Sequence, residues 1–338
     1  RAAQPGPGPS ADLILAHPAA DLDHDRPLVP RADLELLARG VREYEVGGRA
    51  VLDPYPLERP CDGAHGAPLI PWPNRLAGGR YSFDGEEHQV ALTEPVKGNA
   101  IHGFLRWRSW RAVEREPDRV VMATRLHPLP GYPWTLDVRV AYELAPEGLV
   151  VWTTAENLGE HACPYGHGQH PYLSPGPAVG AEGAAGGVEV GAAGTGGGAL
   201  IDGCTLQAPG RTRVVTDSER QLPTGTEPVV GTRFDFTEPR ALGEATIDFA
   251  FCDLDRDAGG RAWTRLCGPD GASAEIWVDE SFPFVELYTG DTLAPDRARR
   301  GLGTEPMTCA PNALATGWGL IRLEPGERAV TTWGARLR

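Results

Sequence analysis

The sequence has no long hydrophobic run and only six cysteines among its 338 residues. No stretch approaches the roughly 18 consecutive apolar residues that are needed to span a bilayer, so we expect no membrane association. No two cysteines have the Cys-x-x-Cys or Cys-x-His spacing of a zinc site; they are Cys61, Cys163, Cys204, Cys252, Cys267 and Cys309. Sparse and scattered cysteines are typical of reduced, mostly buried thiols in a cytosolic protein.

Positive charge is also in short supply. The chain has 32 Lys and Arg residues against 46 Asp and Glu residues, which gives a net charge of −14 at pH 7. Because an acidic surface repels phosphate backbones and anionic lipids, we expect neither nucleic acid nor a membrane surface as a partner. Residues 1–12 lack the apolar stretch of a signal peptide and are expected to form a flexible tail, and no Asn-x-Ser/Thr sequon occurs. These features together predict a cytoplasmic location.

Helical periodicity is almost absent, and 32 prolines discourage helices. The one tempting segment, residues 34–38, is too short to assign. Turn dipeptides instead separate β-rich runs, and the clearest is Asp84-Gly85. Similar signals stand at 47–48, 117–118, 147–148 and 270–271. The pattern predicts an all-β fold, a large antiparallel β-sandwich.

Two segments also predict which side chains are buried. Residues 136–143 alternate strictly, which places on the core face Leu136, Val138, Val140 and Tyr142. Residues 149–154 are more continuously apolar or β-branched, as in a strand that is covered on both sides.

Residues 176–198 are mostly Gly, Ala and Val. A phosphate-binding loop is rejected, because no Lys-Ser/Thr follows and no switch from strand to helix is visible. We expect a flexible surface insertion here. With no internal repeat and no linker, the sequence predicts a single domain over residues 13–338.

Four short motifs follow one another along the chain. They are PWPNRLAGGRY at 71–81, GNAIHG at 98–103, GQHPYL at 168–173 and TEPMTCAPNA at 304–313. In this order and spacing they resemble the aldose 1-epimerase (galactose mutarotase) family, over about residues 40–335. The resemblance implies a galactose-mutarotase-like supersandwich with an open sugar cleft across one sheet, and a reaction without a cofactor.

The resemblance also implies roles for matching residues. His170 would be the general acid and Glu305 the general base. Asn74 and Arg75 of the Asn-Arg motif would bind sugar hydroxyls, and His102 would contact the region of the ring oxygen.

Two further substrate-binding residues follow from looser matches. Asp248 aligns with a sugar-binding Asp, although it could equally be the outward residue of an alternating strand. Tyr172 is included because its ring could stack on a sugar. The same holds for Trp72 and Trp107, and core packing explains all three rings equally well.

The chemistry explains why these residue types are required. Mutarotation removes the proton on the C1 hydroxyl, protonates the ring oxygen O5, and closes the ring on the other carbonyl face. No electron or group is transferred to another molecule, so neither a cofactor nor a metal is expected. Glu has an ordinary pKa of about 4.3 and His of about 6.5. We therefore expect a nearby carboxylate or the anionic site to raise the pKa of His170, so that it can donate.

Three alternatives stay open at this point. His167 and His170 could form a metal pair, but a strand would point them to opposite faces. The basic run at Arg297, Arg299 and Arg300 could bind phosphate, as in a hexose-6-phosphate 1-epimerase. A non-catalytic sugar-binding module on the same scaffold is the third. The sequence specifies neither the preferred aldose nor an oligomeric state.

Overall fold

The structure is a computed structural model, and it describes residues 13–16, 32–37, 40–55, 63–177 and 199–338, the first two segments as backbone only. The expected tail at 1–12 and nearly all of the Gly/Ala-rich insertion, residues 178–198, lie outside the described residues. Strands dominate what is described, and α1 (Ala313–Thr316) is the one α-helix within it. Three short 3₁₀ helices accompany it, η1 (Pro95–Lys97), η2 (Leu105–Trp107) and η3 (Ile201–Gly203).

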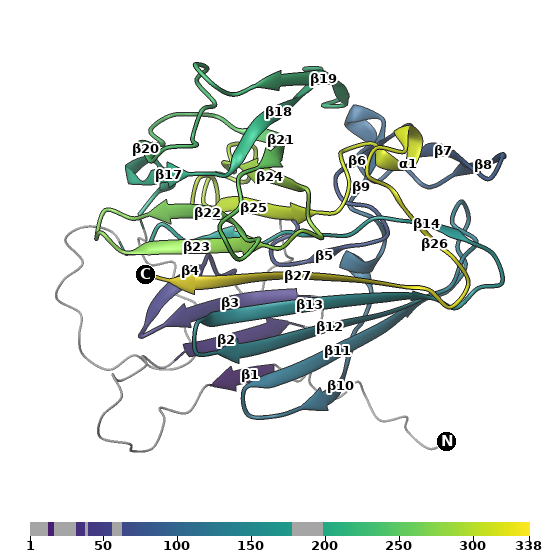
Figure 1. The fold of residues 1–338 in the computed structure, drawn as a ribbon, viewed down its shortest axis with the longest axis horizontal. Helices are drawn as coiled ribbons and strands as arrows, with labels where there is room; N and C mark the ends of the chain where they lie inside the picture. The colour runs from purple at the N-terminus through teal and green to yellow at the C-terminus, as the bar shows by residue number, and fades with distance from the viewer. Residues whose placement is uncertain (1–12, 17–31, 38–39, 56–62, 178–198) are drawn as a thin grey trace, which may run out of the picture.

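Most of the described strands form two large antiparallel sheets (Figure 1). The larger sheet runs in the order β1 (Leu13–Ala16), β2 (Ala32–Leu37), β3 (Gly40–Val46), β4 (Arg49–Leu52), β16 (Tyr172–Leu173), β25 (Leu302–Met307), β24 (Phe284–Tyr288), β21 (Asp248–Leu254), β18 (Gly210–Thr216) and β19 (Pro223–Pro228). Two short strands attach to it, β15 (Gly168–Gln169) and β5 (Pro68–Leu69).

The second sheet has nine strands and packs against the first. Its order is β10 (Arg111–Arg115), β11 (Arg119–Leu126), β12 (Leu136–Ala145), β13 (Gly148–Asn157), β27 (Arg328–Leu337), β23 (Ser273–Val278), β22 (Ala262–Cys267), β17 (Thr205–Gln207) and β20 (Arg240–Ala241). Three two-stranded ladders complete the described fold: β6 (Arg75–Ala77) with β9 (Asn99–Ile101), β7 (Arg80–Phe83) with β8 (Glu86–Gln89), and β14 (Cys163–Tyr165) with β26 (Ile321–Leu323).

The predicted hairpins are confirmed. Asp84 and Gly85 both have positive φ angles, 51° and 81°, and so do Gly47 and Gly48, at 61° and 78°. Positive φ at both central residues is what a two-residue turn needs to match the twist of its flanking strands. The segment 34–38, tempting as a helix, lies mostly in β2 instead.

One hydrophobic core joins the two sheets. Tyr44 and Val51 of the larger sheet and Trp333 of the smaller sheet belong to the same buried cluster. The alternation predicted for β12 is confirmed, because its four core-face side chains are all at most 2% exposed; they are Leu136, Val138, Val140 and Tyr142. The five described cysteines are all free thiols. Among the described residues no helix is long and apolar enough to cross a membrane.

The outer side of the larger sheet is where the motifs meet. Val285 and Leu287 of β24 point into the main core, so Glu286 between them points to the opposite face. Glu305 stands directly opposite Glu286 on the neighbouring strand β25. The sheet thus carries polar side chains on the face that is turned away from the core.

Candidate active site

A cavity of about 270 Å³ opens on this face of the larger sheet. Six of the seven predicted site residues line it, and they come from segments that are far apart in the sequence: Asn74, Arg75, His102, His170, Asp248 and Glu305. The fold therefore brings the four motifs to one place.

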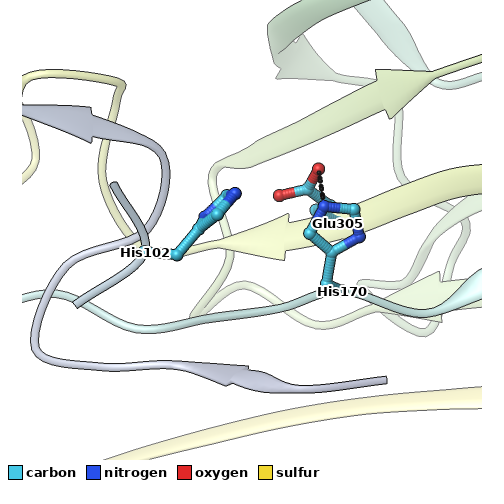
Figure 2. A group of neighbouring side chains, drawn as sticks. All are labelled: His102, His170 and Glu305. Carbon is cyan, nitrogen blue, oxygen red and sulfur yellow. Dashed lines mark ion pairs between the residues drawn. The ribbon is translucent and has the colours of Figure 1, made fainter. Parts of the chain in front are cut away.

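His170 and Glu305 are in direct contact. His170 follows β15, as expected for a residue at a strand end next to a proline, and Glu305 lies within β25. The Nε2 atom of His170 lies 3.0 Å from Oε1 of Glu305, and the two side chains are only 5% and 3% exposed. Figure 2 shows this contact, with His102 facing the carboxylate from the other side. The imidazole and the carboxylate thus share one cavity.

Burial sets the protonation of this pair. Loss of hydration lowers the pKa of His170 well below 6.5, and the nearby charges of His65 and Arg106 lower it further. Burial raises the pKa of Glu305 well above 4.5, as does the charge of Asp248, against an opposing effect of Arg75. The expectation that the site raises the pKa of His170 is therefore wrong, because desolvation is the largest effect and His65 and Arg106 act in the same direction.

His102 is fixed as a hydrogen-bond donor. The backbone N–H of Asn74 donates to Nδ1 of His102 at 3.2 Å, and the backbone N–H of His102 donates to the Asn74 carbonyl at 3.0 Å. Burial lowers the pKa of His102 well below 6.5, and His170, Arg106 and Arg75 add to this, so the ring is neutral. Because Nδ1 accepts a hydrogen bond, the proton of the neutral ring sits on Nε2.

The same tautomer bears on metal binding. The possible ligand atoms of His102, His170 and Glu305 lie within 4.8 Å of one another. A metal ion needs a free lone pair on each ligand, but His102 presents an N–H, since its lone pair on Nδ1 is already engaged by Asn74. This cluster is therefore better suited to hydrogen bonding with a hydroxylated ligand than to holding a metal.

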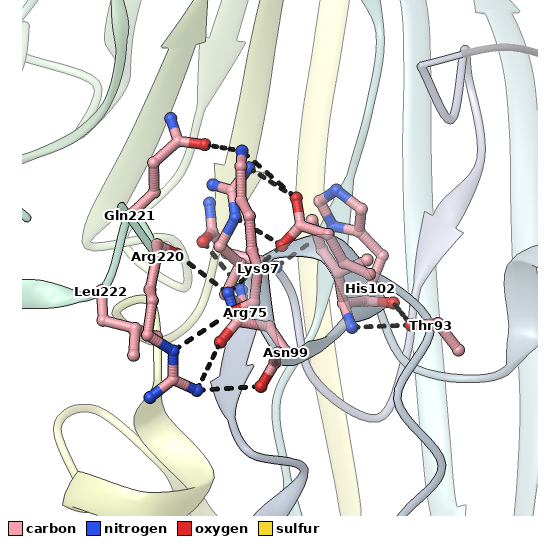
Figure 3. A network of polar contacts seen from close by, with 12 residues as sticks. Arg75, Thr93, Lys97, Asn99, His102, Arg220, Gln221 and Leu222 are labelled. Atoms are coloured by element: carbon pink, nitrogen blue, oxygen red, sulfur yellow. Dashed lines mark hydrogen bonds and ion pairs between the residues drawn. The ribbon is translucent and has the colours of Figure 1, made fainter. Parts of the chain in front are cut away.

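A polar network holds Arg75 at the cavity wall (Figure 3). Arg75 binds the Glu94 carboxylate with two N–H groups, at 3.0 Å and 3.2 Å. Lys97 also contacts Glu94, at 3.4 Å, and donates to the side chain of Gln221. Gln221 in turn donates to Asp248, so a chain of contacts runs from one side of the cavity to the other. Arg75 and Asp248 are thereby held before any ligand binds.

Comparison with known proteins identifies the family. The model described as aldose 1-epimerase matches residues 41–333. This chain belongs to the aldose 1-epimerase family.

Relatives of this aldose 1-epimerase family member span most of the chain. The uncharacterized protein YihR of Escherichia coli is 31% identical over 299 residues, which cover 88% of this chain and 86% of YihR. The human protein named galactose mutarotase is 28% identical over 260 residues, 73% of this chain and 67% of the human one.

Solved structures share the fold. A putative aldose 1-epimerase from Escherichia coli superimposes with a TM-score of 0.74 at 19% identity, covering 97% of this chain and 99% of the other. A galactose 1-epimerase from Lactobacillus acidophilus gives a TM-score of 0.68 at 17% identity, with the same coverages. The fold is therefore the galactose-mutarotase-like β-sandwich that the motifs predict.

Tyr172 is placed differently from the prediction. It does not line the cavity, and its side chain is buried behind His170, with the two rings nearly parallel and their centroids 4.9 Å apart. Its hydroxyl donates to the Gly63 carbonyl at 2.8 Å. Tyr172 thus contacts the predicted acid His170 and not the cavity itself. Within the His-Pro-Tyr segment, the ring of His170 points toward the cavity and the ring of Tyr172 points away from it.

His167 also lies apart from the cavity. It is fully buried, and its Nδ1 atom lies 2.8 Å from the hydroxyl oxygen of Thr331 on β27. Burial lowers its pKa to about 3. His167 is therefore engaged with Thr331 away from the cavity that His170 lines.

The basic run does not form a phosphate site at this cavity. Arg297 binds Asp53 at 2.8 Å, and Arg299 binds Asp202 and Asp291. Neither arginine lines the cavity. Trp107 does line it, at the rim, with its side chain partly exposed and the guanidinium of Arg106 4.9 Å from the centre of its ring.

Two charged residues of the cavity lining, Glu286 and Arg106, were not predicted from the sequence. Glu286 is 2% exposed and lines the cavity beside Glu305. Burial and the charges of Glu305 and Asp248 raise its pKa well above 4.5. The sequence does contain an indication of the importance of Glu286, since it is the sole charged residue in the apolar run from 282 to 290. A lone carboxylate in a strand of this kind points to a functional or strictly paired position.

Proposed function

We propose that this protein is an aldose 1-epimerase that interconverts the α and β anomers of free aldohexoses such as galactose or glucose. The observation that carries the proposal is the 3.0 Å contact between His170 and Glu305 at the wall of a cavity of sugar size. Family membership, and the names galactose mutarotase and galactose 1-epimerase carried by relatives, support it.

The reaction proceeds by ring opening between this acid and this base. Glu305 takes the proton of the C1 hydroxyl while the C1–O1 bond becomes a carbonyl and the C1–O5 bond breaks. The imidazolium of His170 gives its Nε2 proton to O5. After rotation about the C1–C2 bond, O5 attacks the other carbonyl face, returns its proton to His170, and O1 regains the proton from Glu305. The site ends as it began, so one turnover needs no other reagent.

Among the neighbouring residues, Arg75 favours the charged form of the pair that starts this reaction, whereas His65, Arg106 and Asp248 favour the uncharged form. Burial favours imidazole beside carboxylic acid, which is the state that follows ring opening. Arg75 opposes this by lowering the pKa of Glu305. The His102 N–H and Asp248 supply a donor and an acceptor for sugar hydroxyls, which would orient the hemiacetal between the pair.

The two other functions receive less support. A phosphorylated hexose would require a cationic site, and Arg297 and Arg299 are engaged by Asp53, Asp202 and Asp291 away from the cavity. A non-catalytic binding module would not need an acid and a base in contact, whereas this cavity contains both.

Rates of anomer interconversion test the proposal. Polarimetry on fresh α-glucose and α-galactose should show clear acceleration over buffer, and Glu305→Gln and His170→Asn should each reduce kcat by about 10²–10⁴-fold. Glu324→Gln and His161→Asn are matched controls, because both side chains are exposed and far from the cavity lining. Wild-type rates in either cavity variant would contradict the assignment. A preference of tenfold or more for glucose 6-phosphate would instead support the phosphate-specific alternative.

A further inference from the structure

Three aromatic rings form a stack that ends at His170. Tyr172 is nearly parallel to the His170 ring, at 13° and 4.9 Å between centroids. Tyr172 is also stacked on His65, at 4° and 3.7 Å. All three side chains are buried, with exposures of 4%, 1% and 3%. The stack leads from the cavity into the protein behind it.

The far end of the stack is firmly anchored. The Nε2 atom of His65 lies 3.0 Å from Oδ2 of Asp53, and Arg297 binds the same oxygen at 2.8 Å. The backbone N–H of Asp53 donates to the Tyr172 carbonyl at 2.8 Å. Ring opening does not require these three residues, but they have a structural role. The cluster supports Tyr172, through the ring of His65 and through the backbone of Asp53.

The ring of Tyr172, in the middle of the stack, is held by close contact with the backbone at Gly63. The Tyr172 hydroxyl donates to the carbonyl of Gly63, whose φ is +52°. A Cβ atom at Gly63 would lie 2.6 Å from the Tyr172 hydroxyl oxygen, so a side chain there would displace the ring. Glycine at position 63 both adopts this positive φ angle readily and leaves room for the Tyr172 hydroxyl.

His170 lacks the usual means of fixing an imidazole. A functional histidine is commonly oriented by a hydrogen bond from the ring nitrogen that does not face the substrate. The Nδ1 atom of His170 is buried and has no hydrogen-bond partner in another described residue. Apart from the Nε2 contact with Glu305, the orientation of the ring therefore depends on packing, and the face of Tyr172 is a surface against which it packs.

We propose that Tyr172 and His65 are positioning residues for His170, and that their stack sets the imidazole plane so that Nε2 points at Glu305 and the cavity. This inference rests on the proposed function for its kinetic consequence. The face of the Tyr172 ring also favours a cation beside it, which stabilises the imidazolium that ring opening consumes.

The groups that face His170 define the electrostatic background of any test. Glu305 of β25 contacts Nε2, and the His102 ring, after β9, lies 5.3 Å away edge-on. Arg106 of η2 and His65, from the segment before β5, are the nearby groups that lower the pKa of His170. Variants of Tyr172 do not change the identity of any of these four side chains.

The test compares Tyr172→Leu with Tyr172→Phe. Tyr172→Leu removes the ring and should lower kcat on α-glucose by about tenfold or more, with KM changed by less than about threefold, since orientation rather than binding is lost. Tyr172→Phe keeps the ring and should restore most of kcat. Phe236→Leu is the matched control, because it removes an equally buried ring outside the cavity and the stack, and it should leave kcat unchanged.

A second readout does not depend on activity. Nitrogen NMR of histidine-labelled protein reports the tautomer and titration of His170, and Tyr172→Leu should change both, whereas Tyr172→Phe and Phe236→Leu should not.

If Tyr172→Leu does not fold, His65→Leu tests the same stack from its other end, with a smaller loss of kcat expected. Unchanged kcat together with unchanged His170 signals in Tyr172→Leu would overturn the inference. An inactive wild type would instead refute the proposed function, and the NMR result would still decide the role of the stack.

Discussion

The contact between His170 and Glu305 joins two buried groups whose pKa values are shifted in opposite directions, that of His170 downward and that of Glu305 upward. The motifs identify both residues from the sequence, because each stands beside prolines at a fixed position in a distinctive segment. The direction of their pKa shifts was not predictable in the same way. Desolvation depends on how completely Tyr172, His102 and the neighbouring strands exclude water from the two groups, and only the folded structure shows that.

The pH dependence of mutarotation follows from these directions. Adding a second proton to the pair charges His170, whose pKa is lowered, so the acid limb of kcat/KM should lie below pH 6.5. Removing the last proton ionises Glu305, whose pKa is raised, so the rate should fall again only well above pH 4.5. A rate profile on α-galactose, corrected for buffer catalysis, checks both limbs. An acid limb at or above pH 6.5 would show that the site favours the charged imidazole instead.

His167 should make the protein sensitive to acid. Its pKa is about 3 when folded and about 6.5 when unfolded, so the unfolded state binds more protons between these values. Stability is therefore lost as the pH falls, by about 2 kcal/mol between pH 7 and pH 5. His167→Gln should show a smaller loss in urea denaturation over the same interval, with His161→Asn, an exposed histidine, as control. Equal losses in His167→Gln and the wild type would contradict this role.

At the scale of elements, the register of β24 against β25 decides the chemistry of the cavity. It places Glu286 directly opposite Glu305, on the same face of the sheet. The hairpin turns at 47–48 and 84–85 and the alternation of β12 were predictable from the sequence. Register across neighbouring strands was not predictable, so the sequence could not place Glu286 opposite Glu305.

This register predicts a protonated Glu286. Its folded pKa is raised by burial and by the charges of Glu305 and Asp248, so above pH 4.5 the folded state binds more protons than the unfolded state. Stability then falls as the pH rises, by up to about 1.4 kcal/mol per pH unit for one group. Glu286→Gln keeps a neutral donor and should reduce this slope between pH 5 and pH 7, as measured by denaturant unfolding. An unchanged slope would mean that Glu286 is ionised in the folded protein.

The turn that carries His102 should tolerate no side chain at its next residue. Gly103 has a φ of +60°, and a Cβ atom there would lie 2.1 Å from the carbonyl oxygen of Ile70. Gly103→Ala should therefore cost at least about 2 kcal/mol of stability and lower activity by displacing His102. Gly78→Ala is the matched control, because its φ is +62° and nothing lies within 4 Å, so only about 1 kcal/mol is expected. Equal losses in the two variants would show that contact with Ile70 is unimportant.

At the scale of the whole molecule, each sheet has a second face that the core does not cover. The larger sheet uses this face for the cavity. The nine-stranded sheet instead carries a cluster of Val150, Trp263 and Trp277, with Trp152 packed against it. The sequence predicted that residues 149–154 would be covered on both sides, but β13 has a second apolar cover only at Val150, since Trp152 and Thr154 on the same face are half-buried. It comes from aromatic side chains of strands in the same sheet, an arrangement that one strand's own pattern cannot reveal.

The guanidinium group of Arg336 covers part of this aromatic cluster on its solvent side. Arg336 lies 3.8 Å from the centre of the Trp263 ring and binds Glu275, which is 3% exposed, at 2.7 Å. Arg336→Gln would uncover the ring and weaken the pairing of a buried carboxylate, so we expect a loss of about 1–3 kcal/mol. Tryptophan fluorescence should shift to longer wavelength, while mutarotation stays at the wild-type rate because this face lies across the core from the cavity. Arg328→Gln, at an exposed pair with Glu156 on the same sheet, is the control and should cost less than about 1 kcal/mol. A loss in Arg336→Gln no larger than in this control would show that the tryptophans do not need their cationic cover.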